Sequence, residues 1–420
     1  MNTVLPQRII GTDEGVGLFL LRLLVLPFAL LYYVGVTARN ALYDMGLLPQ
    51  ARVRAPVVSV GNLTVGGTGK TPLVIALANR AVAAGKKVAI VARGYGAVAD
   101  EEGRSDEVAL MASRCPGAAV VVAPDKLMGA RQAVAQGAEL VIVDDGLQHR
   151  RLHRDLDVVM IDARSPFSNG MVLPVGALRE PSSGIARADV IVLTHGEALS
   201  PPERESVESR VRSYQREVPV VWAHHSAVGV RPVGGGLLQP PATLSGQDVY
   251  LFCGIASPEG FRQTVEALGA RVTGLMAFPD HHGFTGRDLA AVRAAARSSA
   301  ILCTEKDATK VAHIPGNDDL HCLVIDLHLH GRLPPIPGLD VPWTPPREPA
   351  DDAHAAHGAH AAHGAHAAHG AHGAEDHGGH AHGDGGDADA GGPHAHGSPA
   401  HDKAHDVKAR AAAHGSPAHH

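Results

Sequence analysis

The chain has 420 residues, of which 45% are hydrophobic and 4% aromatic, and it carries a formal net charge of −6. It is long enough for two domains with further segments, and its acidic balance and few aromatic residues give no case for nucleic-acid binding. The four cysteines form no C-x-x-C pair, so we predict buried thiols in a reducing compartment, with neither disulfides nor a zinc site.

The first predicted element is an apolar helix over residues 15–36, which read GVGLFLLRLLVLPFALLYYVGV. The segment approaches the thickness of a bilayer, and its tyrosines lie near one end, where interfacial aromatic residues belong. Arg22 could extend to lipid headgroups, so our first interpretation is a membrane-surface helix. A true span is the second interpretation and a buried core helix the third. The arginines that follow suit a cytoplasmic orientation, and such an anchor suggests a substrate in the membrane.

Residues 57–78, VVSVGNLTVGGTGKTPLVIALA, are the stretch around which the chain is organised. A strand, a glycine-rich loop, Gly-Lys-Thr and a helical pattern follow one another and predict a phosphate-binding loop, although Thr64 replaces the first glycine of the usual pattern. Lys70 would reach the β- and γ-phosphates, and the Thr71 hydroxyl would bind Mg2+. The predicted nucleotide-binding residues are Gly66, Gly67, Thr68, Gly69, Lys70 and Thr71.

A second motif, DDGLQHRRL, begins at the end of the predicted buried strand 140–145 (LVIVDD). A buried strand that ends in carboxylates is the expected partner of a phosphate loop, because it delivers an Asp to Mg2+. We choose Asp144 for that role, and we expect Asp145, Gln148 and His149 to face the substrate.

Strands and helices alternate through the first half of the chain, which predicts an α/β fold with a doubly wound, mostly parallel sheet of the P-loop NTPase type. The predicted strands are residues 57–60, 87–92, 118–123, 140–145, 157–162, 188–194 and 218–222, and the predicted helices are residues 74–84, 107–114, 125–136 and 201–217. Ser105 or Asp106 would cap the second of these helices.

A second, smaller α/β unit follows a junction rich in Gly and Pro, residues 232–245. Its predicted strands are 249–254, 272–276 and 301–304, with helices from residue 258 and over 287–296. We therefore predict four parts: a membrane-associated helix (1–45), a nucleotide-binding domain (46–231), a smaller α/β domain (232–344) and a tail (345–420).

Two stretches of the second unit follow predicted strands, FPDHHGF at residues 278–284 and CTEKDATK at residues 303–310. A lone histidine is by default a hydrogen-bonded interior residue. For two adjacent histidines after an Asp, a functional role and a structural role are about equally supported. In the tail, 17 of the 28 histidines lie between residues 354 and 420, amid Ala, Gly and Asp. No apolar period is present there, so we predict disorder, with either loose Zn2+ or Ni2+ binding or no function.

Several motifs together resemble the tetraacyldisaccharide 4'-kinases of lipid A synthesis, over roughly residues 15–327. The motifs are VGNLTVGGTGKTP, ARGYG, DDGLQHRRL, DVVMID with NGMVLPVGALREP, FPDHHGF and TEKDATK. The resemblance implies transfer of the ATP γ-phosphate, with Mg2+, to the 4'-hydroxyl of an acylated glucosamine disaccharide 1-phosphate. It also implies an N-terminal helix in the cytoplasmic face of the bacterial inner membrane.

The resemblance implies a role for each matching residue. Asp106 would be the catalytic base, assisted by His281, while Lys70 and Thr71 hold phosphate and Mg2+ and Asp144 is the carboxylate on the metal side. The implied disaccharide-binding residues are Tyr95, Asp145, Gln148, His149 and Glu180. The family usually shows Gly-Asp-Glu-Pro around the base, whereas Ser and Val flank the Asp-Glu pair here, so Asp125 is an alternative base.

Two other classes of P-loop protein fit part of the sequence. A metal-delivery GTPase would explain the histidine-rich tail, but the chain lacks an N-K-x-D or T-K-x-D guanine-reading motif. A membrane-bound positioning ATPase would need a lysine early in its phosphate loop, where Val65 and Gly66 stand. The GTPase leaves the apolar N-terminal helix unexplained, and the positioning ATPase has no need of the FPDHHGF stretch.

Overall fold

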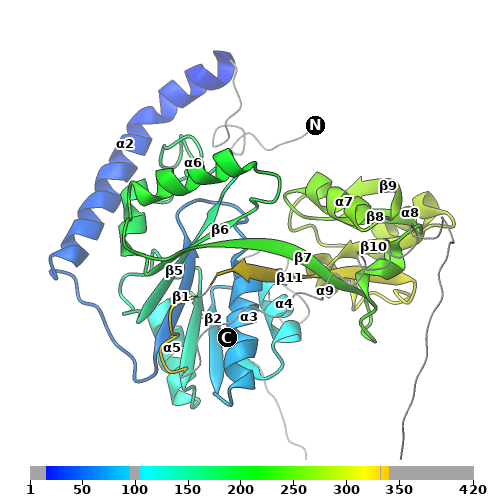
Figure 1. Cartoon of the computed structure of the whole chain (residues 1–420), viewed down its shortest axis with the longest axis horizontal. Helices are drawn as coiled ribbons and strands as arrows, with labels where there is room; N and C mark the ends of the chain where they lie inside the picture. The colour runs from blue at the N-terminus through cyan, green and yellow to red at the C-terminus, as the bar shows by residue number, and fades with distance from the viewer. Residues whose placement is uncertain (1–15, 95–104, 332, 340–420) are drawn as a thin grey trace, which may run out of the picture. The chain divides into compact units, whose positions relative to one another are not determined.

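One continuous sheet organises the part of the chain that the structure describes, residues 16–94, 105–331 and 333–339 of the computed structural model. Its strands lie in the order β3-β2-β4-β1-β5-β6-β7-β11-β10-β8-β9 (Figure 1). The strands are β1 (Val57–Asn62), β2 (Val88–Ala92), β3 (Ala118–Val122), β4 (Leu140–Asp144), β5 (Leu156–Asp162), β6 (Val190–Thr194), β7 (Val220–Pro232), β8 (Asp248–Cys253), β9 (Arg271–Ala277), β10 (Ala300–Thr304) and β11 (Leu320–His330). The helices are α2 (Val16–Asp44), α3 (Lys70–Ala83), α4 (Asp106–Arg114), α5 (Lys126–Ala135), α6 (Pro201–Arg212), α7 (Pro258–Ala267), α8 (Gly286–Ala296) and α9 (Glu305–Val311).

Neighbouring strands of this sheet are parallel, apart from the pair β7 and β11. Parallel strands are covered on both faces and read as continuous apolar runs, which is why VVSVGN and LVIVD are recognisable as strands. The predicted α/β fold with a mostly parallel sheet is confirmed.

Helices cover both faces of the first half of the sheet. Leu73 of α3 and Met111 of α4 are buried in the same cluster as Val58. Leu127 of α5 is buried in the cluster that contains Val57. Successive side chains of a strand point to opposite faces, so β1 separates these two cores, and its end lies between them at one edge of the sheet.

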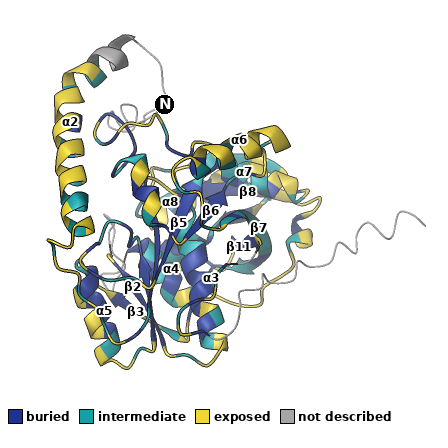
Figure 2. Ribbon diagram, turned by 60° about the vertical axis from the view of Figure 1, so that its left-hand side comes forward, coloured by how far each residue is buried: buried dark blue, intermediate teal, exposed yellow. Residues whose placement is uncertain are grey.

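The helix α2 packs on the protein through one side only. Ala29 is 3% exposed and joins Tyr32 in a core cluster, whereas Leu24 and Leu31 are 71% and 73% exposed. Figure 2 shows exposed residues along most of the helix. By length and composition, Leu21–Asp44 is able to cross a membrane. The interpretation as a buried core helix is therefore wrong.

The ladder of β7 and β11 differs from the prediction. We expected a short strand over residues 218–222 and no strand near the end of the second unit. Instead, β7 continues to Pro232 and pairs antiparallel with β11, from Trp222↔His330 to Pro232↔His321. Most of β7 is half-buried and carries polar residues, so it lacks the apolar run that marks the parallel strands. This ladder joins the first part of the sheet to the second.

Two helices also differ from the prediction. The helix α3 begins at Lys70 instead of residue 74, since the first turn of a helix tolerates the proline that follows Lys-Thr. The TEKDATK stretch forms α9, where we predicted no helix; the Thr304 hydroxyl accepts a hydrogen bond from the Asp307 N–H and caps it.

Some predictions fall outside the described residues. Tyr95 lies there, and so does the tail from residue 345, with its predicted disorder and metal binding. The division of the folded part at residue 232 stays a prediction.

Candidate active site

The phosphate-binding loop connects β1 to α3. Gly69 is the N-cap of α3 with φ 79°, and a Cβ at this position would lie 2.9 Å from the His225 ring, so the backbone and the neighbouring ring both require glycine. The Thr194 hydroxyl, at the end of β6, donates a hydrogen bond to the Thr68 carbonyl (3.1 Å) and supports the loop from a strand two places away in the sheet. The first N–H groups of α3 have no partner within the helix, so this turn is suited to binding a phosphate group.

Asp145 lies between two cations at the end of β4. The pairing of β1 with β4 sets Val60 beside Asp144 and so brings the DDG turn to the loop. Lys70 Nζ lies 3.6 Å from Asp145 Oδ1, and Arg179 donates to Oδ2 at 2.5 Å. Burial alone would raise the pKa of Asp145, but the charges of Lys70 and Arg179 outweigh it and hold this pKa below its ordinary value. The ionised carboxylate therefore orients Lys70.

Asp144 is 6% exposed, and its Oδ1 has no hydrogen-bond partner. Burial raises the pKa of Asp144 to about 6, and the Glu107 carboxylate adds to this effect against the opposing charges of Lys70 and Lys126. A buried polar atom without a partner is costly. This oxygen is thus suited to a cation that arrives with a nucleotide.

Lys126 is a buried lysine that the sequence prediction missed. It is 1% exposed, and its ammonium donates to the Val91 carbonyl at 3.2 Å. Burial lowers the pKa of Lys126 to about 8, despite the charges of the two aspartates at the end of β4. Arg93 and Glu107 also act on it, so the ends of β2 and β4 and the starts of α4 and α5 meet around this side chain.

Asp106 begins α4 and is 6% exposed. Its Oδ2 lies 3.1 Å from His281 Nδ1 and 3.1 Å from Lys310 Nζ. His281 has a left-handed backbone with φ 60°, which is uncommon for a residue other than glycine. The structure thus brings together Asp106 and His281, which are 175 residues apart in the chain, and adds Lys310, which the sequence prediction did not name.

Glu180 is fully buried and fully engaged. It accepts hydrogen bonds from Arg187 (2.7 Å), Asn40 of α2 (2.8 Å) and the Gln148 amide (2.8 Å). Gln148 also donates to the Asn62 carbonyl at 2.9 Å, while its own Oε1 is buried without a partner. Glu180 therefore holds the DDGLQH segment and α2 in place, and Gln148 keeps an unused acceptor.

His149 and Asp125 complete the predicted set. His149 is half-buried, and burial lowers its pKa. Asp125 caps α5: its Oδ1 accepts from the Leu127 N–H (2.8 Å), and its Oδ2 pairs with Arg151 (3.0 Å). Both oxygens of Asp125 thus have structural partners, which makes it a poorer base than Asp106.

A family model described as "Tetraacyldisaccharide-1-P 4'-kinase" matches residues 21–334. The chain belongs to this family. It is 45% identical over 293 residues to the tetraacyldisaccharide 4'-kinase of Anaeromyxobacter dehalogenans (strain 2CP-C), across 65% of this chain and 77% of that relative. The enzyme of the same name from Syntrophus aciditrophicus (strain SB) is 37% identical over 316 residues, across 69% and 84% of the two chains.

A solved structure of the family is also similar to this chain. The crystal structure of LpxK from Aquifex aeolicus in complex with ATP matches with a TM-score of 0.61 and 32% identity, across 74% of this chain and 95% of that one. Membership in the family confirms the resemblance drawn from the motifs and indicates an ATP-dependent kinase. It favours this class over the metal-delivery GTPase.

Mg2+, the usual partner of ATP, fits the residues at the end of β4. Asp144 offers an unpartnered buried oxygen, and Thr71 lies in the first turn of α3 beside Lys70. No group of three or more His, Cys, Asp or Glu side chains within residues 16–94, 105–331 and 333–339 is arranged to hold a metal ion. This agrees with the preference of Mg2+ for one or two carboxylates together with substrate phosphates.

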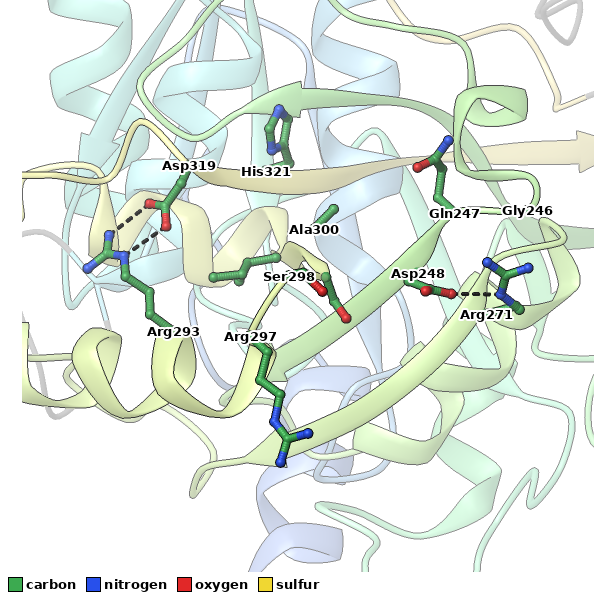
Figure 3. Close-up of a pocket in the computed structure, with 12 residues that line it drawn as sticks. Gly246, Gln247, Asp248, Arg271, Arg293, Arg297, Ser298, Ala300, Asp319 and His321 are labelled. Carbon is green, nitrogen blue, oxygen red and sulfur yellow. Dashed lines mark hydrogen bonds and ion pairs between the residues drawn. The ribbon is translucent and has the colours of Figure 1, made fainter.

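A separate cavity of 720 Å³ lies at the amino ends of β8 and β10 (Figure 3). Asp248 and Ala300, the first residues of these strands, line it, whereas ligands of open α/β sheets bind at the carboxyl ends. Two of its arginines are already paired, Arg271 with Asp248 (2.6 Å) and Arg293 with Asp319 (2.8 Å). None of the predicted site residues lines this cavity, so we separate it from the candidate active site.

Proposed function

We propose that this chain transfers the γ-phosphate of ATP to the 4'-hydroxyl of a tetraacylated glucosamine disaccharide 1-phosphate, in lipid A synthesis. One observation carries the proposal beyond family membership: a phosphate loop and a carboxylate that contacts a histidine both lie at the carboxyl ends of strands. Asp106 follows the end of β2, and the influence of Glu107 on Asp144 puts the start of α4 near the end of β4. A nucleotide and a proton acceptor can thus share one edge.

The nucleotide part of the site would bind and orient the triphosphate. Lys70 and the first N–H groups of α3 would neutralise charge on the transferred phosphoryl group, and Asp145 and Arg179 would hold Lys70 in place. Asp144 and Thr71 would hold Mg2+, which supplies further charge neutralisation between the β- and γ-phosphates when bound. Catalysis of this transfer is mainly positioning and electrostatic stabilisation.

Asp106 would accept the proton of the sugar hydroxyl. A hydroxyl is a weak nucleophile at neutral pH, and a positioned base contributes at least about 100-fold to the rate. His281, 3.1 Å from Asp106 Oδ2, would orient the carboxylate. The sugar oxygen then forms the new O–P bond as ADP leaves with the electron pair of the broken one.

The disaccharide would lie beside the DDGLQH segment. Asp145, Gln148 and His149 come from this segment, and the unpartnered Gln148 Oε1 suits a sugar hydroxyl. We assign Glu180 the support of Gln148, because its oxygens already have three protein partners. Tyr95 lies outside the described residues, and we include it in the proposed site on the basis of the sequence alone.

The substrate and α2 would meet at the cytoplasmic face of the inner membrane. The exposed side of α2 carries Leu23, Leu24, Phe28 and Leu31, all at least 56% exposed, and such a surface is suited to lipid. The Tyr32 hydroxyl donates to the Arg179 carbonyl at 2.7 Å, so the lipid-facing helix is tied directly to the proposed site.

A transfer assay tests this function. The purified full chain is incubated with γ-labelled ATP, Mg2+ and a tetraacylated disaccharide 1-phosphate in detergent micelles, and the lipid fraction is examined for label. We expect label with the wild type and none with Lys70→Met, while the exposed-lysine variant Lys87→Met keeps full activity. Parallel arms with GTP and with the chain shortened by residues 345–420 test the metal-delivery alternative. Normal ATP binding without labelled lipid would refute the proposal.

A further inference from the structure

The helix α9 directs two lysines toward the Asp106–His281 pair. Lys306 and Lys310 stand at positions i and i+4 of this helix, so their side chains share one face. Lys310 Nζ lies 3.1 Å from Asp106 Oδ2, and Lys306 Nζ lies 3.5 Å from His281 Nε2. Each member of the pair therefore has its own lysine, and both lysines come from the TEKDATK stretch, to which the proposed function gives no role.

Lys310 is fixed relative to Asp106 by a second carboxylate. Lys310 is 7% exposed, and its ammonium donates to Asp307 Oδ1 at 3.1 Å. Asp307 is fully buried and also accepts from the Gly254 N–H (3.0 Å) and the Thr304 hydroxyl (2.7 Å). A buried cation persists only when it is paired, and this pairing leaves the ammonium little freedom to leave Asp106.

Lys306 selects the protonation of the histidine. An ammonium group has donors and no acceptor, so Lys306, 3.5 Å from Nε2 of His281, favours the tautomer in which this nitrogen is unprotonated, against the opposite influence of the Asp280 carboxylate 3.8 Å from the same nitrogen. Nδ1 then carries the hydrogen and donates it to Asp106 Oδ2. Asp280 Oδ1, 3.4 Å from Lys306 Nζ, holds the lysine at this place.

We propose, as an extension of the kinase function above, that Lys310 and Lys306 are positioning residues that make one oxygen of Asp106 the proton acceptor. Two donors, the Lys310 ammonium and the His281 N–H, converge on Oδ2. The contacts of Asp106 within the described part of the chain go to Oδ2, which leaves Oδ1 to accept the hydroxyl proton. The sugar O–H bond breaks, its proton goes to Oδ1, and the sugar oxygen forms the O–P bond while ADP leaves. The proton on Oδ1 then passes to water.

A purely structural role for Lys310 predicts a different result from a positioning role. An ion pair that only fastens α9 to α4 affects stability and leaves the kcat of the folded enzyme unchanged. A cation that fixes the Asp106 carboxylate in one orientation affects kcat in a variant that is still folded and still binds ATP. The charged groups around Asp106 are Lys310 from α9 and His281 from the loop after β9, with Asp307, Lys306 and Asp280 behind them.

The test measures kcat and KM with the full chain and the glycolipid acceptor. The main variant is Lys310→Met with Asp307→Asn, because the double change avoids an unpaired buried carboxylate. Lys310→Arg keeps the charge, Lys306→Gln removes the outer lysine, and Lys87→Met is the matched control on the surface. ATP binding and thermal unfolding report whether each variant is folded.

We expect the double variant to lose about 100-fold in kcat with an ATP KM near that of the wild type. Lys310→Arg, which keeps the charge, should restore most of the lost kcat, and Lys306→Gln should lose about 10-fold. A folded double variant with the wild-type kcat would overturn the inference, as would a loss confined to KM. Absence of lipid phosphorylation by the wild type would instead refute the proposed function, and the inference with it.

Discussion

The nucleotide site is formed by the phosphate-binding loop together with Asp145, and the Asp106 cluster is formed by Asp106, His281, Lys306 and Lys310. These two sites are assembled from the chain in opposite ways. The loop and its helix come from one continuous stretch, and parallel pairing adds Asp145 from the adjacent strand. The Asp106 cluster joins α4, the loop after β9 and α9, from both halves of the sheet. The nucleotide site is thus formed mainly by residues that are close in the sequence. Asp106 meets His281 and Lys310 only when both halves of the sheet have formed.

The two clusters nevertheless share one electrostatic plan. Asp145 lies between Lys70 and Arg179, and Asp106 lies between Lys310 and His281. In each, donors on both sides hold a carboxylate in one orientation. The difference is that each oxygen of Asp145 faces its own cation, while both contacts of Asp106 go to a single oxygen. We therefore expect Asp106 to have the largest effect on turnover, whereas Glu180 and Asp125, whose oxygens have protein partners, should act through structure.

The largest expected effect follows from Asp106→Asn. Loss of the proton acceptor should lower kcat by about 1000-fold, within the range for a positioned base, and leave the ATP dissociation constant near that of the wild type. Steady-state kinetics with the glycolipid acceptor and an ATP-binding titration measure the two quantities. Wild-type turnover in this variant would break the comparison, because the cluster would then hold only structural ion pairs.

Glu180→Ala should act on stability. The change leaves Arg187 without its carboxylate next to a fully buried position, which should cost about 3 kcal/mol of unfolding free energy. Denaturant unfolding measures the loss, and Glu208→Ala, which removes a half-exposed helical pair with Arg212, is the matched control with a loss of about 0.5 kcal/mol at most. Unchanged stability with a raised KM for the glycolipid would make Glu180 a direct substrate contact.

His225, whose ring lies against Gly69, should make stability depend on pH. Burial lowers the pKa of His225 to about 4, with the neighbouring His195 adding to the effect. In the unfolded chain a histidine protonates near pH 6.5, so unfolding takes up a proton below this value. The contribution of His225 is therefore complete above about pH 6.5 and is lost as the pH falls toward 4, by about 3 kcal/mol.

Replacing His225 by Asn should flatten this acid dependence. Unfolding free energies from pH 4 to 8 measure it, and His313→Asn, at an exposed position, should keep the wild-type slope. An unchanged slope in the His225 variant would show that the ring is protonated or absent from the interior in solution.

The smallest effect is expected for Asp125→Ala. Loss of the cap on α5 should cost about 1 kcal/mol of unfolding free energy and leave kcat unchanged, because both oxygens of Asp125 have structural partners. Thermal unfolding and the transfer assay measure these effects. A large loss of turnover without a loss of stability would transfer the role of base from Asp106 to Asp125.

The sequence predicts the parts of this molecule whose signals are local. Buried parallel strands, the glycine loop and the aspartates after β4 are each written in a few adjacent residues. The sequence does not predict β11, because its alternating polar residues meet half-buried partners on β7. It also gives no sign that Lys126 and Lys310 are buried, since a lysine in a short polar stretch ordinarily lies in solvent. Only the packing of distant segments makes these two lysines interior cations.

The place of β11 has a consequence for how the protein is made. This strand is the last among the described residues, yet it lies inside the sheet between β7 and β10. Leu327 and Leu329 of β11, together with Leu339 beyond it, fill the same core as Leu73 of α3. A nascent chain that ends before β11 therefore contains the complete phosphate-binding loop, but the hydrophobic core around Leu73 still lacks the side chains of β11. Translation has to pass residue 339 before the nucleotide half can reach its native stability, so early termination in the second half disables the first.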